Sequence, residues 1–148
     1  MVTYTDLNLF LRVHNNYDIQ DYIRLLAYLS IAPPISAEIF HRNLESIMSM
    51  GTIIVAHDNG CIVGTGTVII EPKLIRAGQC VGHIEDIVVH PDWRGQNIAA
   101  TILRMLKEYA VSKNCYKVIL DCNPAVQGLY AKCGFHVSGI QMAESLLV

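Results

Sequence analysis

The chain has 148 residues, of which 52% are hydrophobic and 16% charged, and a formal net charge of −2 at pH 7. This length is close to the commonest size of a single domain, and the apolar content is far above that of disordered chains. The isoelectric point is about 6.3, whereas proteins that bind nucleic acid or anionic membranes typically carry an excess of basic residues. We therefore expect one domain, residues 1–148, that binds neither.

The five cysteines indicate neither a disulfide framework nor a zinc site. Their number is odd, and no two have the spacing of metal-binding pairs. The N-terminal residues lack the basic start of a secretory leader. The longest apolar stretch, 25–35, is broken by Pro33 and Pro34 and is shorter than the roughly 20 residues that span a bilayer. We expect reduced, mostly buried thiols in a cytoplasmic protein that holds no metal.

Hydrophobic periodicity in the N-terminal half predicts a strand, two helices and a hairpin. Asp18 and Ser36 are N-cap residues that precede apolar positions with helical spacing. Asn59-Gly60 is the turn that a two-residue hairpin favours. The expected elements are a strand at 8–13, helices at 19–30 and 37–50, and strands at 52–57 and 61–71.

Strands and helices alternate in the C-terminal half. The expected elements are strands at 82–89, 116–121 and 137–146, and helices at 98–113 and 125–133. This order predicts an α/β domain (α+β in some schemes) with a mixed central sheet flanked by about four helices.

The loop between the expected strand 82–89 and helix 98–113 has the features of a phosphate site. The first turn of a helix offers free N–H groups and the positive end of the dipole. Arg94 adds a cation that pairs with phosphate oxygens, and Gly95 permits a tight turn. The alternative is an ordinary connecting loop in which the glycine serves geometry alone. Neither a P-loop nor a Rossmann fingerprint is present.

The segment from Val89 to Ala99 resembles the acetyl-CoA loop of the GNAT acetyltransferases. Their pattern Arg/Gln-x-x-Gly-x-Gly/Ala is matched by Arg94 and Ala99, whereas Asn97 stands where glycine is usual. Asparagine tolerates left-handed backbone better than most residues. The resemblance implies the GNAT acyl-CoA N-acyltransferase fold, with acetyl-CoA as co-substrate and no metal.

Further stretches resemble the glucosamine-6-phosphate N-acetyltransferase family. They are GHIEDIVV (82–89), CYKVILDC (115–122), LYAKCGF (129–135) and GIQM (139–142). The resemblance implies acetylation of the 2-amino group of D-glucosamine 6-phosphate, a step of amino sugar metabolism in UDP-N-acetylglucosamine biosynthesis. It also implies a homodimer with shared active sites, and the apolar residues 146–148 suit either such an interface or a core.

The family resemblance also assigns roles by position. The implied substrate-binding residues are Ser30, Lys73, Leu74, Ile75, Arg76, Glu85, Asp86, Ile87, Tyr116, Lys117 and Asp121. The implied cofactor-binding residues are Ile87, Val88, Val89, Arg94, Gly95, Gln96, Asn97, Ile98, Ala99, Ala100, Tyr130, Ala131 and Lys132. Two positions depart from the family. A family arginine that meets the substrate phosphate falls on Ser145, and a family asparagine falls on Val126, so Lys73, Arg76 and Lys117 are the cations left for the phosphate.

Three side chains suit the catalytic steps of acetyl transfer to an amine. Glu85 is the candidate base, directly or through water, and Asp121 is the candidate that orients the amine. Adjacent strand residues point to opposite faces, so Glu85 and Asp86 reach one pocket together only if a bulge re-aims one of them. Tyr130 is the candidate acid, because a phenol of pKa about 10 can protonate a thiolate whose acid has a pKa of about 8.5.

Each of these assignments has a plainer alternative. Either acid is then a solvated or capping carboxylate, and the tyrosine is a packing residue. Backbone N–H groups near Ile87 and Val88 are candidates for holding an oxyanion and for pairing with pantetheine amides. Cys122 is expected to be a core thiol rather than a nucleophile. The alternative functions are a GNAT enzyme for another small amine or a protein N-terminus, and a catalytically quiet acetyl-CoA-binding module.

Overall fold

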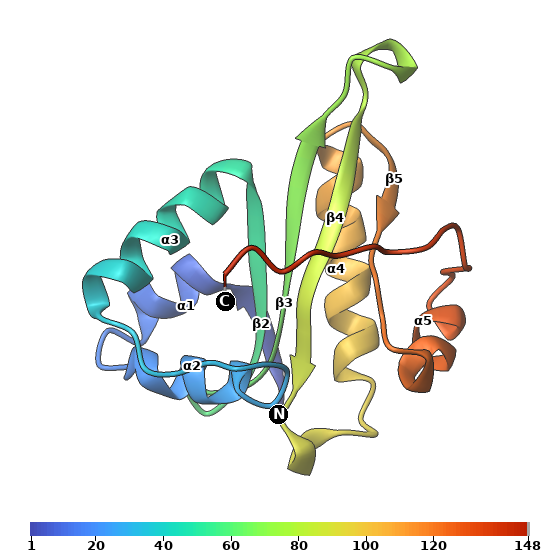
Figure 1. Cartoon of the computed structure of the whole chain (residues 1–148). Coiled ribbons are helices and arrows are strands. Elements are labelled where there is room, and N and C mark those ends of the chain that lie inside the picture. The colour runs from blue at the N-terminus through green and yellow to red at the C-terminus, as the bar shows by residue number, and fades with distance from the viewer. Residues whose placement is uncertain (148) are drawn as a thin grey trace.

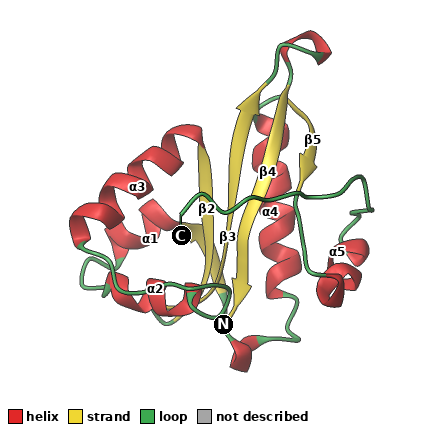
Figure 2. Cartoon of the chain, viewed as in Figure 1, coloured by secondary structure: helices red, strands yellow, loops and turns green. Residues whose placement is uncertain are grey.

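The computed structural model describes residues 1–147, in which the strands form one five-stranded sheet (Figures 1 and 2). The strands lie in chain order, and every neighbouring pair is antiparallel except β4 and β5, which are parallel. The strands are β1 Thr3–Asp6, β2 Gly51–Asp58, β3 Cys61–Pro72, β4 Cys80–Val89 and β5 Cys115–Ile119. The mixed sheet expected from the sequence is confirmed.

The described chain contains five α-helices, which cover both faces of the sheet. Helices α1 to α3 pack on one face against β2 and β3, and α4 packs on the other face against β2 to β5 (Figure 1). The helices are α1 Leu7–Val13, α2 Ile19–Leu26, α3 Ala37–Met50, α4 Ile98–Ser112 and α5 Gln127–Lys132. None of the helices in residues 1–147 is both long and apolar enough to cross a membrane.

Side-chain caps fix where three of the helices begin. Asp6, Asp18 and Ser36 each accept a hydrogen bond from an N–H group two or three residues further along the chain, at 2.9–3.2 Å. Each cap satisfies a donor that the first helical turn leaves unpaired. The caps at Asp18 and Ser36 were expected from the sequence, whereas the one at Asp6 was not.

The prediction of a strand at residues 8–13 is wrong, because this segment belongs to α1. Leu7 and Phe10, three residues apart, are 0% and 1% exposed, whereas Leu9 is 49% exposed. This is the burial pattern of a helix. The first strand is instead β1, which pairs antiparallel with β2. The run of leucines alternates with other residues, and that alternation hid the helical spacing.

The prediction of a strand at residues 137–146 is also wrong. Residues 137–147, hereafter the C-terminal arm, contain neither helix nor strand and cross in front of the sheet in Figure 1. Val137, Ile140, Met142, Leu146 and Leu147 are 72–91% exposed. A strand needs a ladder partner as well as an alternating sequence, and the described chain supplies none here. The apolar residue at 148 lies outside the described residues.

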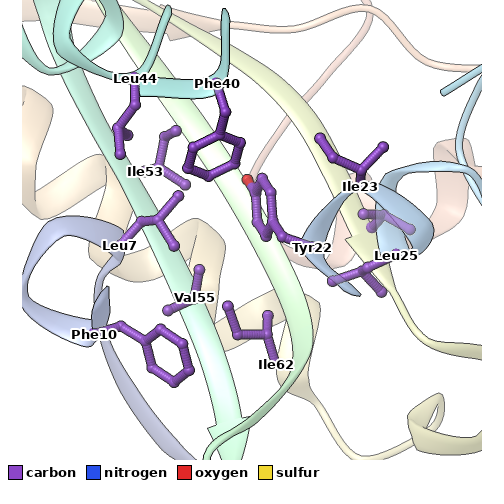
Figure 3. Close-up of a cluster of buried hydrophobic side chains, with 11 residues drawn as sticks. Leu7, Phe10, Tyr22, Ile23, Leu25, Phe40, Leu44, Ile53, Val55 and Ile62 are labelled. Carbon is purple, nitrogen blue, oxygen red and sulfur yellow. The ribbon is translucent and has the colours of Figure 1, made fainter. Parts of the chain in front are cut away.

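The core consists of two clusters separated by the sheet. Ile53 and Val55 of β2 face the cluster beneath α1 to α3, which Figure 3 shows, whereas Ile54 and Ala56 face the cluster beneath α4. Tyr22 of α2 lies in the first cluster with its ring 6.1 Å from that of Phe40. The period-2 alternation of β2 thus divides its side chains between two apolar layers.

The five cysteines are unpaired, and the expectation that they are mostly buried is wrong. Cys61 and Cys122 are exposed, and the other three are half-buried. Cys61, Cys80 and Cys115 occupy the first positions of strands β3, β4 and β5.

Candidate active site

A bulge interrupts β4 in the middle of its pairing with β3. Because the register shifts between Thr65 and Thr67, Gly66 lies opposite two residues of β4, Asp86 and Ile87. The φ angle of Asp86 is 53°, in the left-handed region that non-glycine residues rarely adopt. A Cβ on Gly66 would lie 2.4 Å from Cδ1 of Ile87 and 2.7 Å from Cγ2 of Ile102, so a larger residue opposite the bulge would have to displace these side chains.

The bulge changes the faces that the residues of β4 present. Ile84 and Ile87 pack in the cluster beneath α4 although they are three residues apart. Glu85 therefore faces the side of α1 to α3. Asp86 is near enough to Tyr22 of α2 for its charge to contribute to the raised pKa of that phenol. The bulge that the sequence analysis named as the condition for both acids to reach one pocket is present.

Strands β4 and β5 separate just before the bulge. Their parallel ladder runs from Cys80 and Cys115 to His83 and Ile119 and then stops. From residue 84 to Val89, the edge of β4 that faces β5 has no strand partner in the described chain. An unpaired edge of this kind accepts an extended amide chain in the manner of an added strand.

The carboxyl group of Glu85 has a raised pKa. Partial burial is the main cause, because it disfavours the charged form, and the negative charges of Asp121 and Asp86 add to it. His83 acts in the opposite direction. A carboxylate with a raised pKa is a stronger base than an ordinary surface glutamate.

Asp121 is close enough to both Glu85 and Tyr130 for its charge to affect them. Asp121 lies on the segment after β5, and its charge raises the pKa values of both Glu85 and Tyr130. Partial burial is the main reason for the raised pKa of the Tyr130 phenol, followed by Cys122. The expectation that Cys122 is a core thiol is wrong, since it is exposed on that segment.

The loop between β4 and α4 turns where a phosphate would be held. Asn97 adopts the left-handed conformation, with φ 59°, and no side chain caps α4 there. Gly95, with φ 79°, has no atom within 4 Å of its missing Cβ. The Nε of Arg94 donates to the carbonyl of Val89 at 3.1 Å, which leaves its terminal nitrogens for other acceptors. Free N–H groups, open space and a held guanidinium fit an anionic phosphate.

Comparison with known proteins agrees with this geometry. The family model described as "Acetyltransferase (GNAT) family" matches residues 20–135. The chain belongs to the GNAT acetyltransferase family. Enzymes of this family use acetyl-CoA.

Several relatives of this GNAT chain carry more specific names. It is 39% identical over 126 residues to "Glucosamine 6-phosphate N-acetyltransferase 1" of Oryza sativa, covering 82% of this chain and 76% of that one. It is 37% identical to "Glucosamine 6-phosphate N-acetyltransferase" of Trypanosoma brucei brucei, covering 96% and 99%. The crystal structure of glucosamine-6-phosphate N-acetyltransferase from Arabidopsis thaliana aligns with a TM-score of 0.86, at 32% identity and 99% coverage of both chains. The GNAT fold expected from the sequence is confirmed.

The predicted cofactor residues of this GNAT domain lie along one path. Residues 87–89 form the unpaired edge of β4, 94–97 form the loop, and 98–100 form the first turn of α4. Tyr130, followed by Ala131 and Lys132 in α5, packs against the cluster that contains Val89 and Ile98.

The predicted sugar residues 73–76 lie apart from the acids of the same chain. They form the turn between β3 and β4, and Glu85 lies five residues beyond the start of β4, roughly 16 Å along the strand. Lys73 forms an ion pair with Glu71. The guanidinium of Arg76 lies 5.1 Å from the ring centre of Tyr116 in β5, and Lys117 also lies against that ring.

Three further positions are Ser30, a predicted substrate-binding residue, and Val126 and Ser145, which differ from the family residues. Ser30 lies in the turn after α2, where its N–H donates to the carbonyl of Leu26. Val126 is 45% exposed just before α5. Ser145 lies in the C-terminal arm, where its hydroxyl donates to the carbonyl of Leu147 at 3.1 Å.

Two polar groups near the bulge were missed by the sequence analysis. The hydroxyl of Tyr22 is 3.0 Å from that of Thr65, which donates to the carbonyl of Ile54, and burial raises the pKa of Tyr22 to about 12. His83 bonds to Glu71 across the β3–β4 ladder. His83 had a usable signal, since it precedes Glu85 by two residues and shares its strand face. Tyr22 had none, because its spacing is that of a packing residue.

Proposed function

We propose that this GNAT protein transfers the acetyl group of acetyl-CoA to the 2-amino group of D-glucosamine 6-phosphate. The products are N-acetyl-D-glucosamine 6-phosphate and CoA, and the step supplies UDP-N-acetylglucosamine biosynthesis. The observation that carries the proposal is the bulge in β4, which sets the raised-pKa carboxyl of Glu85 beside an unpaired strand edge. The names of the relatives supply the acceptor.

The cofactor assignment rests on matching shapes and charges. The N–H and C=O groups of residues 87–89 offer a ladder to the amides of a pantetheine arm. Arg94, Gly95 and the start of α4 suit the pyrophosphate. Acetyl-CoA supplies an activated acyl group and a thiol leaving group. N–H groups at Ile87 and Val88 then stabilise negative charge on the carbonyl oxygen.

The proton transfers are assigned to three side chains of this chain. Glu85 takes the proton of the amine, directly or through one water, and its raised pKa suits a base that works near neutral pH. Asp121, close enough to Glu85 to perturb it, accepts a hydrogen bond from the amine and orients it. Tyr130 keeps its proton at neutral pH because its pKa is raised, and it donates that proton to the leaving sulfur.

We also propose that the working form is a homodimer in the cytoplasm. The C-terminal arm exposes five large apolar side chains, more than a free monomer presents to water without cost. The residues 73–76 lie roughly 16 Å along β4 from Glu85 of their own chain, which favours a site completed by a partner, as the family resemblance implies. Five unpaired cysteines fit a reducing compartment.

One observation favours a second candidate function. Lys73 is ion-paired with Glu71, and Ser145 replaces the family arginine, so Arg76 and Lys117 are the predicted phosphate cations without an ion-pair partner in residues 1–147. A weaker phosphate site would suit another small amine or a protein N-terminus.

The test is thiol release from acetyl-CoA by the purified protein, with glucosamine 6-phosphate and glucosamine compared as acceptors. We expect rapid turnover with the phosphorylated sugar and at least a tenfold lower kcat/KM without the phosphate, which is about 1.4 kcal/mol. Equal turnover of the two sugars would favour the second candidate. Acetyl-CoA binding without turnover of any amine would indicate a binding module.

A further inference from the structure

His90 lies between the loop that leads into α4 and the turn that follows α2, and its ring contacts both. Its Nδ1 accepts a hydrogen bond from the N–H of Asp92 at 3.2 Å. Its Nε2 is 3.4 Å from the hydroxyl of Tyr28, and the two rings meet edge to face with centres 5.1 Å apart. The backbone N–H of His90 donates to the carbonyl of Val63 in β3 at 2.8 Å, so the residue itself is anchored to the sheet.

The two ring nitrogens of His90 have different partners and therefore different roles. A nitrogen that accepts from an amide N–H carries no hydrogen, so the neutral ring holds its hydrogen on Nε2. That Nε2–H donates to the oxygen of Tyr28. One tautomer thus satisfies both contacts, one on each side of the ring.

The Nδ1 contact holds the cofactor side of the site. His90 is the N-cap of the short turn Pro91–Trp93, and its carbonyl accepts from the N–H of Trp93 at 2.9 Å. Arg94 follows directly, with its N–H bonded to the carbonyl of Pro91 at 3.3 Å. The cap therefore fixes the turn from which the loop at residues 94–97 departs.

The Nε2 contact holds the acceptor side of the site. Tyr28 and Ser30 belong to one hydrogen-bonded turn, since their N–H groups donate to the carbonyls of Leu25 and Leu26, each at 3.1 Å. The side chain of Tyr28 is half-exposed, so burial does little to hold it. In Figure 1 the end of α2 and the loop after β4 both lie at the lower end of the sheet, as this contact requires.

We propose that His90 is a positioning residue that sets the two halves of the active site separately. Through Nδ1 it holds the acetyl-CoA loop, and through Nε2 and Tyr28 it holds the turn that carries Ser30 against the acceptor. This inference rests on the proposed function, in which Arg94, Gly95 and the start of α4 bind acetyl-CoA, and on the family resemblance, which implies that Ser30 contacts the acceptor.

The two roles are separable by substitution because the side-chain oxygen of asparagine stands where Nδ1 does. His90→Asn keeps the cap but is too short to reach Tyr28, whereas His90→Ala loses both contacts. We expect His90→Ala to weaken acetyl-CoA binding about fivefold, as loss of a cap does, while His90→Asn stays within about twofold of the wild-type affinity. Both variants should raise the KM for glucosamine 6-phosphate by about threefold to fivefold.

Tyr28→Phe isolates the acceptor side. It should raise the acceptor KM, leave the dissociation constant of acetyl-CoA unchanged, and add nothing in the His90→Asn background, because the hydroxyl acts through Nε2. His41→Asn, on the exposed face of α3, is the matched control and should change neither constant.

The measurements are calorimetric binding of acetyl-CoA and steady-state kinetics with varied acceptor. Equal acetyl-CoA affinities for His90→Asn and His90→Ala would overturn the role of Nδ1. Additive effects of Tyr28→Phe and His90→Asn would overturn the role of Nε2, and parallel losses that follow the unfolding temperature would reduce His90 to a packing residue. A wild-type protein that binds no acetyl-CoA would instead refute the proposed function and this inference together. Turnover of a different amine would leave the inference standing, with that amine used for the KM.

Discussion

The cofactor half and the acceptor half of the site differ in how far a single chain completes them. The unpaired edge of β4, the loop at 94–97 and the first turn of α4 are joined to the core by hydrogen bonds and packing. The hairpin turn at 73–76 and the C-terminal arm expose apolar side chains, with Leu74 102% and Ile140 91% exposed. A single domain therefore builds the whole of the proposed acetyl-CoA site, whereas we propose that a second chain completes the acceptor site.

The largest expected effect is that of Glu85→Gln, which removes the proposed base between the two halves. We expect kcat to fall by about a hundredfold or more, the usual range for loss of general-base catalysis. The acid limb of the wild-type kcat profile should lie above the pH at which an ordinary glutamate titrates, because burial raises the pKa of Glu85. That limb should vanish in the variant. The profile of kcat against pH measures both.

The unfolding temperature of Glu85→Gln distinguishes a loss of catalysis from a loss of folding. A carboxyl group whose pKa is raised in the folded state contributes stability below its unfolded pKa, and that contribution is lost as pH rises through the folded pKa. Ionised Glu85 therefore costs stability at neutral pH, and Glu85→Gln should unfold at the same temperature or a higher one. Glu108→Gln, on the exposed face of α4, is the control. If Glu85→Gln kept the kcat of the wild type, Glu85 would not be the base, and another group would have to accept the proton.

Removing the C-terminal arm after residue 136 should break the acceptor half and spare the cofactor half. We expect a monomer by light scattering, a loss of about tenfold or more in kcat/KM for the acceptor, and acetyl-CoA affinity within about twofold of wild type. Ser138→Ala, at an exposed polar position of the same arm, should stay dimeric and active. A truncated chain that is still a dimer would place the interface outside the arm.

The smallest expected effect distinguishes two asparagines with the same backbone conformation. Asn97 and Asn114 have φ values of 59° and 60°, at the start and just beyond the end of α4. Alanine at either position should lower the free energy of unfolding by about 1 kcal/mol, because a Cβ disfavours left-handed backbone, whereas glycine should not. Only Asn97→Ala should also weaken acetyl-CoA binding. Equal affinities of the two alanine variants would mean that the loop geometry at Asn97 is unimportant for the cofactor.

The sequence predicted best what depends on a few neighbouring residues. The caps at Asp18 and Ser36 and the Asn59-Gly60 turn appear where expected, with φ values of 48° and 79° in the turn. Asn97 adopts the left-handed conformation that its place in the loop required. Each feature is decided by one side chain or one turn, so local propensity is enough.

Features that depend on distant partners were left open or missed. The offset of Asp86 is set by its pairing with Gly66, twenty residues earlier, and nothing in the local sequence marks it. Residues 137–146 alternate as a strand does, but no strand of the described chain pairs with them. The contact of His90 with Tyr28 spans 62 residues. These three features bear on the proposed chemistry, the proposed assembly and the proposed coupling of the site, on which sequence patterns alone gave least.

The bulge in β4 also limits how this strand can change in length. Residues before it and residues after it reach the correct faces because one extra residue separates them, so Ile84 and Val89 share a face although five positions apart. Deleting Asp86 would leave Ile84 and Val89 four positions apart, which is the same face of a regular strand, whereas deleting a residue of β4 outside the bulge would turn one end of the strand to the wrong side of the sheet. Loss of one residue at the bulge is therefore expected to change reactivity and spare the folding of β4, whereas the same loss elsewhere in the strand is expected to disrupt its core contacts.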